Sequence, residues 1–437
     1  MLFYNGRSRE EQRMNKRLIS FVLTFIMLIT MVPSTIVEAS EVTTMESVKA
    51  SSNQSEVTKP EENTIYAVNP LYEDVISIDD LKKKLDSSND EQLFGSSTGQ
   101  YFSDYDGAVL YLRKQMVSRE TEINLNFPES WFTSHKDGLY WDLLYDAMKC
   151  DDSSTGQEGD ALLYGYAGCN VSYSTAGYIK YTMAYHSNAE QEAKLTEAVA
   201  VAMAKLQLNG LSEAKKITKI HDYICNHVDY EYNSKEEQIY TAYGALCTGK
   251  AVCQGYAVLF YRLCKEAGLS VRIISGTGNG GPHAWNIVRI GSKYYNVDCT
   301  WDDQSGGFYY NYFLRNDEYY DTCSQYSKNC HKEESYWEDY LPVCSLDSGS
   351  SWNTPGTLPE ITGKADNPQI MAVDAGDKYY IQMICGLDGA QIYYNIEGRK
   401  PVVAAEKNCL YREGFYLDKS RINMIQAIAV KDTYYDS

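Results

Sequence analysis

The sequence predicts an α+β protein of several domains, in which a helix carries a cysteine and an antiparallel sheet carries a histidine and an aspartate. The chain has 437 residues, a length that suits two or three domains of roughly 150 residues each. Helix-type spacing of apolar residues follows Ser212 and Cys253, whereas alternating β-type runs separated by turns fill 365–437. This order of patterns predicts a mixed domain followed by a small all-β sandwich.

The composition of the chain excludes some classes of protein. Hydrophobic residues make up 44% of the chain, which is enough for ordinary buried cores. The formal net charge of −19 repels phosphate backbones, so we do not expect nucleic acid as a partner. Twelve cysteines in a chain of this length do not indicate a small disulfide scaffold.

The N-terminus has the pattern of a secretory signal peptide. An uncharged apolar run, Leu18 to Val32, follows Lys16 and Arg17, and small residues occupy the −3 and −1 positions of a cut after Ala39. The run is short for a membrane span of ~20 residues, although an uncleaved membrane anchor is the alternative. We therefore expect a secreted or cell-surface protein, with the membrane contacted only through this segment if it is retained.

Changes of composition divide the rest of the chain. Within the N-terminal part, tyrosine-rich runs in 162–185 predict two or three strands, and 188–208 predicts a helix. The expected organisation is a signal peptide at 1–39, a disordered tether at 40–64, an α+β region of unknown role at 65–208, a catalytic domain at 209–344, a linker at 345–364 and a β-sandwich at 365–437.

Cys253 lies where a helix is expected to begin. Apolar residues continue one face of that helix through Cys264, and Gly268 follows at its expected end. The positive end of the helix dipole favours the thiolate form of a cysteine at this position. Cys253 is therefore a candidate nucleophile.

A glycine-rich run, GTGNGG at 276–281, formally fits the pattern G-x-G-x-x-G. Dinucleotide binding needs a helix after that pattern, but His283 and Trp285 lead into a strand instead. We interpret 276–281 as a flexible loop and expect no cofactor.

Residues 283–300 predict a β-hairpin with Gly291 and Ser292 at its turn. In this register the numbers of opposed residues sum to 583, so His283 and Asp298 are diagonal neighbours on one face, within roughly 5–8 Å. A histidine can take the proton of a thiol, and a carboxylate can hold the imidazole in one tautomer. The spacing alone leaves open that Cys253, His283 and Asp298 are all structural.

Three strings in order, GKAVCQGYA, GPHAWNIV and YYNVDCTWDD, resemble the motifs of the transglutaminase-like superfamily, which has a papain-like fold. The strings KIHDYICNHVDYEYN and NYFLRNDEYY extend this resemblance over 211–330, and it is most similar to the bacterial secreted, cytokinesis-type transglutaminase/protease-like branch. The resemblance implies that Cys253 is the nucleophile, His283 the base and Asp298 the group that orients it. Trp285 and Trp301 would be supporting aromatic residues.

Two cysteines depart from the family pattern. Cys299 stands where an aliphatic residue is usual, and Cys247 lies just before the cysteine motif, so either could be a disulfide partner. The C-terminal part resembles the chitobiase/hexosaminidase C-terminal type of β-sandwich, which implies either a spacer or a carbohydrate-associated module that contacts a cell-wall polymer.

Together these features predict an exported cysteine-dependent enzyme that transfers acyl groups from carboxamide or peptide bonds of a protein or peptide substrate. Water as acceptor would make it a protease or amidase, the outcome that an open loop at 276–281 favours, whereas an amine would make it a transglutaminase. The alternative is a non-catalytic adhesion or scaffold protein. No metal site is expected, because no C-x-x-C pair occurs, His221 and His227 fall on different helix faces, and His331 is placed at the surface.

Overall fold

The computed structural model describes residues 62–69, 77–86, 99–135, 138–149, 154–304, 306–322, 330–334, 341–357, 363–396, 410–419, 425–431 and 434–435. The predicted signal peptide at 1–39 lies outside the described residues, as does nearly all of the predicted tether. Every helix in the described ranges is too short or too polar to cross a bilayer.

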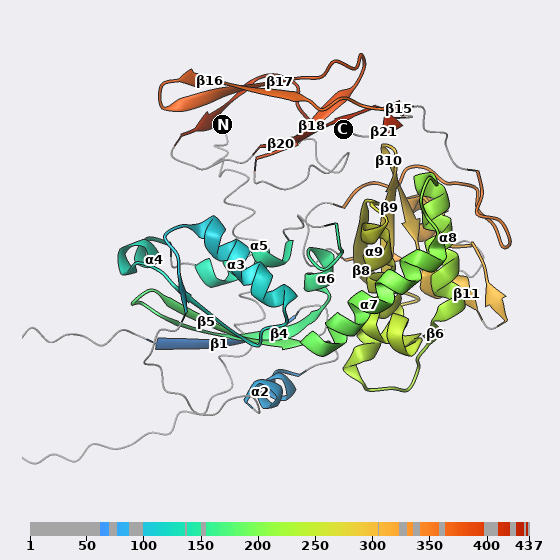
Figure 1. The fold of residues 1–437 in the computed structure, drawn as a ribbon, viewed down its shortest axis with the longest axis horizontal. Coiled ribbons are helices and arrows are strands. Elements are labelled where there is room, and N and C mark those ends of the chain that lie inside the picture. Colours follow the sequence, from blue (N-terminus) through green and yellow to red (C-terminus); the bar gives the residue numbers. More distant parts are fainter. Residues whose placement is uncertain are drawn as a thin grey trace, which may run out of the picture. The chain divides into compact units, whose positions relative to one another are not determined.

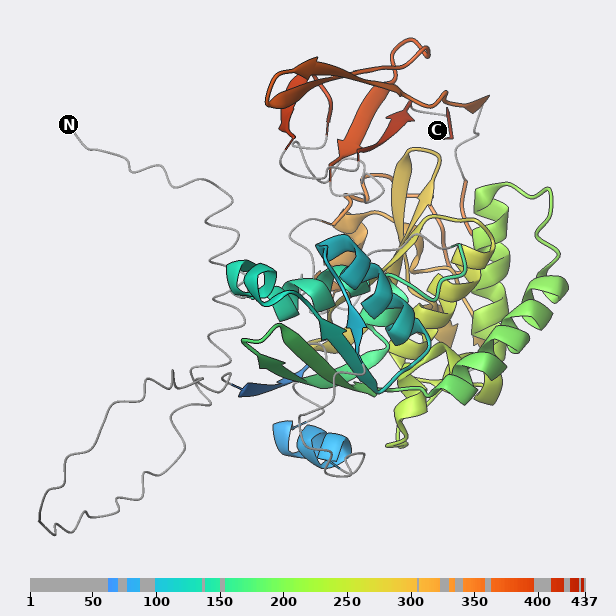
Figure 2. The ribbon, with the colours of Figure 1, turned by 60° about the vertical axis from the view of Figure 1, so that its left-hand side comes forward.

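The N-terminal region is built on a five-stranded sheet with the strand order β1-β4-β5-β3-β2. Helices cover both faces: α3 and α5 pack on one and α2 on the other (Figures 1 and 2). The two strands and the helix expected in 162–208 are present as β4, β5 and α7. The strands are β1 (Glu62–Val68), β2 (Gln100–Tyr101), β3 (Glu122–Asn126), β4 (Tyr166–Ser174) and β5 (Tyr178–Tyr185), and the helices are α2 (Ile78–Asp86), α3 (Tyr105–Val117), α4 (Glu129–His135), α5 (Leu139–Lys149) and α6 (Asp160–Leu163).

Three long helices follow in sequence. α7 (Ala189–Leu206) begins with a capping box between Asn188 and Gln191, and α8 (Glu213–His227) begins after Ser212, as its apolar spacing predicts. α9 (Cys253–Glu266) begins at Cys253 and is buried on nearly every side, and Gly268 follows its end with φ +75°. The predicted position of Cys253 at a helix N-terminus is confirmed.

A second five-stranded sheet packs against α9 and has the order β13-β10-β9-β8-β14. The predicted register is confirmed, because Lys293 lies opposite Ile290 and Val297 opposite Asn286. Its strands are β8 (Val271–Gly278), β9 (Gly281–Ile290), β10 (Lys293–Val297), β13 (Phe313–Arg315) and β14 (Lys332–Glu333). Shorter elements are β6 (Asp229–Tyr230), β7 (Lys250–Ala251), α10 (Cys299–Asp302), β11 (Asp303–Gln304), β12 (Gly307–Phe308) and α11 (Asp317–Thr322), with a 3-10 helix at Glu237–Tyr240 and a π-helix at Gly244–Thr248.

The glycine-rich run is ordered, so its interpretation as a flexible loop is wrong. β8 continues through Gly278 and β9 starts at Gly281, which leaves Asn279 and Gly280 as a two-residue turn with φ +56° and +78°. Positive φ at both turn positions matches the twist of the flanking strands and favours Asn-Gly. Gly276 is needed for a different reason: a Cβ there would lie 2.0 Å from the Lys332 carbonyl oxygen, so glycine lets β14 approach β8.

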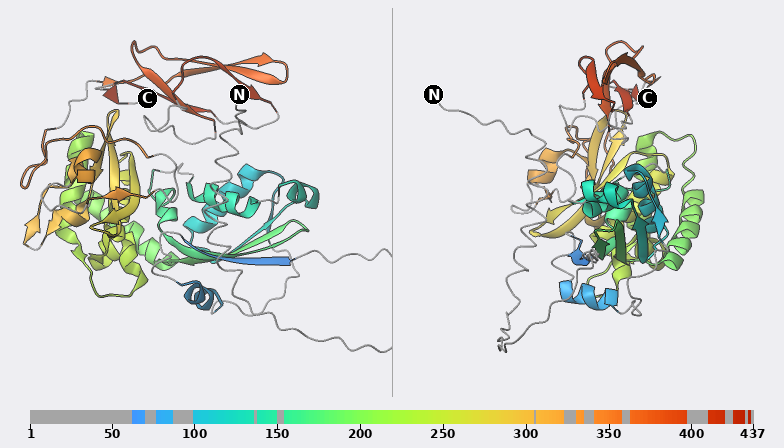
Figure 3. Two further views of the ribbon diagram at one scale, coloured as in Figure 1. Left: turned by 180° about the vertical axis from the view of Figure 1, so that it is seen from behind. Right: turned by 90° about the vertical axis from the view of Figure 1, so that its left-hand side faces the viewer.

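The C-terminal part is an all-β region, as predicted. β16, β17 and β19 form one sheet, whereas β18 and β20 pair separately (Figure 3). Ile381, Met383 and Ile392 are buried between them. The strands are β15 (Gly363–Lys364), β16 (Gln369–Ala375), β17 (Lys378–Ile384), β18 (Gln391–Asn395), β19 (Phe415–Asp418), β20 (Gln426–Val430) and β21 (Tyr434–Tyr435). With the two mixed regions before it, this confirms the predicted α+β class.

A buried ion pair joins the N-terminal region to the second sheet. Asp160 at the start of α6 accepts hydrogen bonds from Nε and Nη2 of Arg272, both at 2.9 Å, and from the Ile273 amide at 2.7 Å. Asp160 is 3% exposed, so its charge depends on these partners. Buried apolar side chains from Phe102 to Leu314 also form one connected core across both regions.

Replacing Asp160 by alanine should lower the free energy of unfolding by about 3 kcal/mol, because Arg272 and the Ile273 amide would lose their partner. Glu122→Ala is a matched control, since Glu122 pairs with Lys180 at 2.9 Å in an exposed setting and should contribute less than ~1 kcal/mol. Urea unfolding of both variants measures the difference. Equal effects would contradict a structural role for the Asp160 pair.

Candidate active site

The N-terminus of α9 is held in place by contacts on either side of Cys253. Gln254 is buried and donates hydrogen bonds to the carbonyl oxygens of Tyr164 at 3.0 Å and Tyr240 at 2.9 Å. A Cβ on Gly255 would lie 2.5 Å from the Ile239 carbonyl oxygen, so glycine allows this close packing. Cys253 itself is partly exposed, which leaves its thiol accessible at a fixed helix start.

His283 lies in β9 between the other two candidate residues. Its Nε2 is 2.8 Å from Oδ2 of Asp298, and the Cys253 thiol is near enough to the same imidazole to favour its protonated form. Burial opposes protonation of His283, but Asp298 and Cys253 outweigh it and raise its pKa to about 10. The structure therefore brings together all three residues that the sequence singled out. Since Nε2 faces the carboxylate, Nδ1 is the nitrogen left to exchange a proton with the thiol.

Asp298 ends β10 and caps α10. Its Oδ1 accepts the backbone N–H groups of Thr300 at 2.9 Å and Trp301 at 3.2 Å, which leaves Oδ2 for the histidine. Burial disfavours the charged carboxylate, yet His283 and His331 hold the pKa of Asp298 well below its usual range. Asp298 is thus an ionised, fixed hydrogen-bond acceptor at neutral pH.

His331 is a second partner of Asp298 that the sequence did not predict. Its placement at the surface is wrong: it is 2% exposed, and its Nε2 lies 2.9 Å from the same Oδ2 that His283 contacts. Its ring packs against Tyr320, Trp301 and Trp285 at centroid distances of 4.1, 4.2 and 4.9 Å. The sequence contains only an indirect indication of this contact, which is Gly276. The missing side chain at Gly276 allows β14, which begins directly after His331, to join the sheet.

Two tryptophans flank the imidazole of His283. Trp301 stacks on it at 5.0 Å with an interplanar angle of 29°, and Trp285 lies at 6.1 Å with an angle of 23°. A Cβ on Gly278 would lie 2.9 Å from the same ring and 2.8 Å from Trp301, so glycine is required there as well. These contacts fix the plane of the imidazole.

Tyr230 lies beside the nucleophile because β6 pairs with β7, opposite Ala251. Burial together with the neighbouring Cys253 thiol raises the pKa of Tyr230 to about 12. Tyr230 therefore stays protonated at neutral pH. An amide and a phenol next to a thiol are two donors that can face a developing oxyanion.

The structure also bears on the candidate disulfide partners and on a group of side chains that could bind a metal. Cys247 is exposed, Cys299 is buried, and both are free cysteines rather than disulfide partners. His283, Asp298 and His331 bring metal-ligating atoms within 4.8 Å of one another. Both histidine Nε2 atoms, however, already contact Asp298 Oδ2.

Replacing His331 by phenylalanine should keep the aromatic packing but remove one hydrogen bond from Asp298, which loosens the carboxylate that orients His283. We expect acylation of Cys253 to slow by about 10-fold, the usual scale for such supporting partners. His331→Gln retains an N–H donor at a similar reach and should recover most of the rate. Equal loss in both variants, measured by single-turnover acylation, would contradict a role through hydrogen bonding.

Stability should depend on pH through His283. The pKa of His283 is about 10 when folded, against ~6.5 in an unfolded chain, so its contribution is fully present below ~6.5 and is lost as pH rises through 10. Denaturant unfolding of wild type and His283→Gln should therefore show a difference that shrinks from pH 6 to pH 10. A difference that grows over this range would contradict the assignment.

Comparison with known proteins gives a consistent family. Residues 201–299 match the profile of the transglutaminase-like superfamily. Kyphoscoliosis peptidase from Mus musculus and that from Homo sapiens are each 30% identical over 105 residues, covering 21% of this chain and only 16% of the relative.

Two solved structures are also similar, a TGase and a candidate cysteine protease from Cytophaga hutchinsonii. They share 14% and 17% identity, cover 48% and 31% of this chain and 60% and 58% of their own, and have TM-scores of 0.23 and 0.21. The mixed helix-and-sheet region that holds Cys253, His283 and Asp298 has a transglutaminase-like, papain-like fold, and residues 201–299 are similar to the transglutaminase-like superfamily.

Proposed function

We propose that this protein is a cysteine-dependent enzyme that transfers acyl groups from carboxamide or peptide bonds of a protein or peptide. The observation that carries the proposal is the position of His283, which hydrogen-bonds the ionised carboxylate of Asp298 at 2.8 Å and lies close enough to Cys253 for the thiol to raise its pKa. An accessible thiol at a helix N-terminus with a base in contact is the arrangement that nucleophilic catalysis requires.

In the first half of the reaction, the Cys253 thiol gives its proton to His283. The thiolate attacks the substrate carbonyl carbon, and the electron pair of the C=O bond moves to the oxygen. The amide at the start of α9 and the neighbouring Tyr230 hydroxyl are the candidate donors to that oxyanion. The carbonyl then re-forms, the C–N bond breaks, His283 returns its proton to the leaving amine, and a thioester remains.

In the second half, His283 removes a proton from water or from an amine, which attacks the thioester carbon. The C–S bond then breaks and the Cys253 thiolate is regenerated. The ordered turn at Asn279 and Gly280 removes the argument for hydrolysis that depended on an open loop beside His283. Experiment must therefore decide whether water or an amine accepts the acyl group.

Alkylation tests the reactivity of the thiol against an internal control. Cys247 is exposed and Cys253 only partly exposed, so accessibility alone would make Cys247 react faster. Activation by His283 predicts the reverse: iodoacetamide at pH 6 should label Cys253 at least ~10-fold faster, and His283→Gln should abolish that preference. Faster labelling of Cys247 in wild type would contradict the proposal.

Activity is tested by incubating the full chain with casein and a labelled primary amine. Cleavage or deamidation that is lost in Cys253→Ala would indicate hydrolysis, and incorporation of the amine would indicate transfer. Asp298→Asn should slow either reaction by roughly 10³–10⁴-fold, because the tautomer of His283 is no longer fixed. A fast-reacting Cys253 without any turnover across varied substrates would favour the non-catalytic scaffold.

The proposal includes export and a surface location. It is supported by the apolar run from Leu18 to Val32 and the small residues before a cut after Ala39. It assigns the chain to the bacterial secreted branch of the superfamily and the C-terminal all-β region to contact with a cell-wall polymer. Pull-down on purified cell wall with and without residues 345–437 tests that last assignment.

A further inference from the structure

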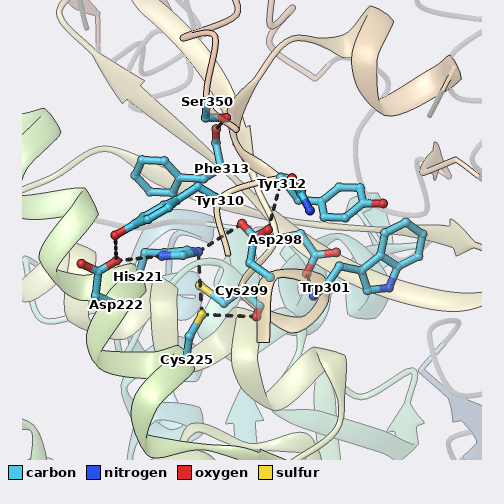
Figure 4. A network of polar contacts seen from close by, with 12 residues as sticks. His221, Asp222, Cys225, Asp298, Cys299, Trp301, Tyr310, Tyr312, Phe313 and Ser350 are labelled. Carbon is cyan, nitrogen blue, oxygen red and sulfur yellow. Dashed lines mark hydrogen bonds and ion pairs between the residues drawn. The ribbon is translucent and has the colours of Figure 1, made fainter. Parts of the chain in front are cut away.

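A second cluster of cysteine, histidine and aspartate lies apart from Cys253. Helix α8 contributes His221 and Cys225, four residues apart and therefore on one face, and α10 contributes Cys299 and Asp302. Their exposed fractions are 0%, 7%, 3% and 0%, so all four side chains are buried. We propose that His221, Cys225, Cys299 and Asp302 bind one structural zinc ion (Figure 4).

Two distances in the cluster match edges of a tetrahedral site. Nε2 of His221 lies 3.2 Å from Oδ2 of Asp302 and 3.7 Å from Sγ of Cys225. Zinc bonds of about 2.0–2.1 Å to nitrogen and oxygen and 2.3 Å to sulfur give tetrahedral edges of ~3.4 Å from N to O and ~3.6 Å from S to N. The ligand atoms of His221, Cys225 and Cys299 lie within 4.8 Å of one another, whereas Asp302 is that close only to His221 and would have to move toward the two sulfurs on binding. Two sulfurs, one imidazole and one carboxylate are a ligand set that zinc accepts.

Hydrogen bonds from neighbouring residues determine which atoms of His221 and Asp302 face the cluster. Nδ1 of His221 lies 3.1 Å from Oδ1 of Asp222, which also accepts the Tyr310 hydroxyl at 2.9 Å. Nε2 faces Oδ2 of Asp302, so metal binding would displace any proton from Nε2, while Nδ1 would keep its proton, which it donates to Asp222. The other oxygen of Asp302 accepts the Tyr312 amide at 2.9 Å, so Oδ2 is directed at the cluster. The carboxylates of Asp222 and Asp302 thus contact the two different ring nitrogens of His221.

Aromatic rings close the cluster off from water. Tyr310 stacks on His221 at 5.3 Å, and Phe313 and Phe308 lie at 4.7 and 5.8 Å. Binding would release the two thiol protons and leave two thiolates, one carboxylate and a neutral imidazole around Zn²⁺. The formal charge of the site would then be −1, whereas the same groups ionised without a metal would be strongly disfavoured in this apolar setting.

The ion would also support the candidate active site. Asp298 is the N-cap of α10, directly before Cys299. A metal that fixes Cys299 and Asp302 to α8 therefore holds the short helix whose N-cap residue, Asp298, orients His283. This role is positional, because the cluster itself is buried and does not contact the Cys253 thiol.

Metal analysis of the full chain tests the proposal. Wild-type protein should contain about one zinc per chain, and protein stripped with a chelator should take up Zn²⁺ alone and melt at a higher temperature after reloading. Reloading with Co²⁺ should give the intense visible bands of a tetrahedral ion together with thiolate-to-metal charge transfer. Folded wild type without zinc that takes up neither ion would overturn the proposal, as would Co²⁺ bands of an octahedral site.

Variants separate the cluster from other thiols. Cys225→Ala and Cys299→Ala should lose most of the zinc, whereas Cys169→Ala removes an equally buried cysteine in β4 and should keep it. Cys253→Ala should also keep it, so a failed enzyme assay and a failed zinc site can be told apart. Zinc retained in both cluster variants, or a disulfide between Cys225 and Cys299 found by peptide mass spectrometry of wild type, would overturn the proposal. If the variants do not fold, the Co²⁺ spectrum of wild type decides.

Discussion

The carboxylate of Asp298 connects the separate parts of the candidate site. It accepts hydrogen bonds from His283, His331 and the amides of Thr300 and Trp301, so both of its oxygens are fully used inside the protein. A buried charge with one missing partner is costly, and the same contacts therefore hold β9, the chain before β14 and the start of α10 in one arrangement. The geometry of His283, and through it the state of Cys253, follows from this single group.

The sequence was sufficient to predict contacts that depend on local periodicity. Gly291 and Ser292 at the turn set the hairpin register, and the register places His283 and Asp298 on one face. Cys253 at the start of α9 follows from the glycines that bracket its helix. His331 could not be found in this way, because it meets Asp298 from 33 residues away and no periodic pattern links the two. The same holds for Cys225 and Asp302, which only tertiary packing brings together.

The glycine-rich run shows how one pattern can be misread. Glycine is common in mobile loops, but each glycine of 276–281 can equally be required by close packing or by positive φ. Here Gly276 makes room for β14, Gly278 makes room for His283 and Trp301, and Gly280 completes a tight turn. A sequence does not say whether a glycine stands in a mobile loop or in a crowded place, and the structure shows crowding at Gly276 and Gly278.

The two cysteine–histidine–aspartate groups contain the same residue types but have different roles. They differ in how far their cysteines are exposed to solvent. Cys253 is partly exposed, so a substrate carbonyl can reach its sulfur and a thiolate there is useful as a nucleophile. Cys225 and Cys299 are buried behind aromatic rings, where a substrate has no access and a thiolate is tolerable only beside a cation. Both groups are anchored on α10, with Asp298 on the side of the accessible thiol and Cys299 and Asp302 on the other. A change in the position of this one short helix would therefore alter both sites together, which is the physical reason to expect that metal binding and the alignment of His283 are linked.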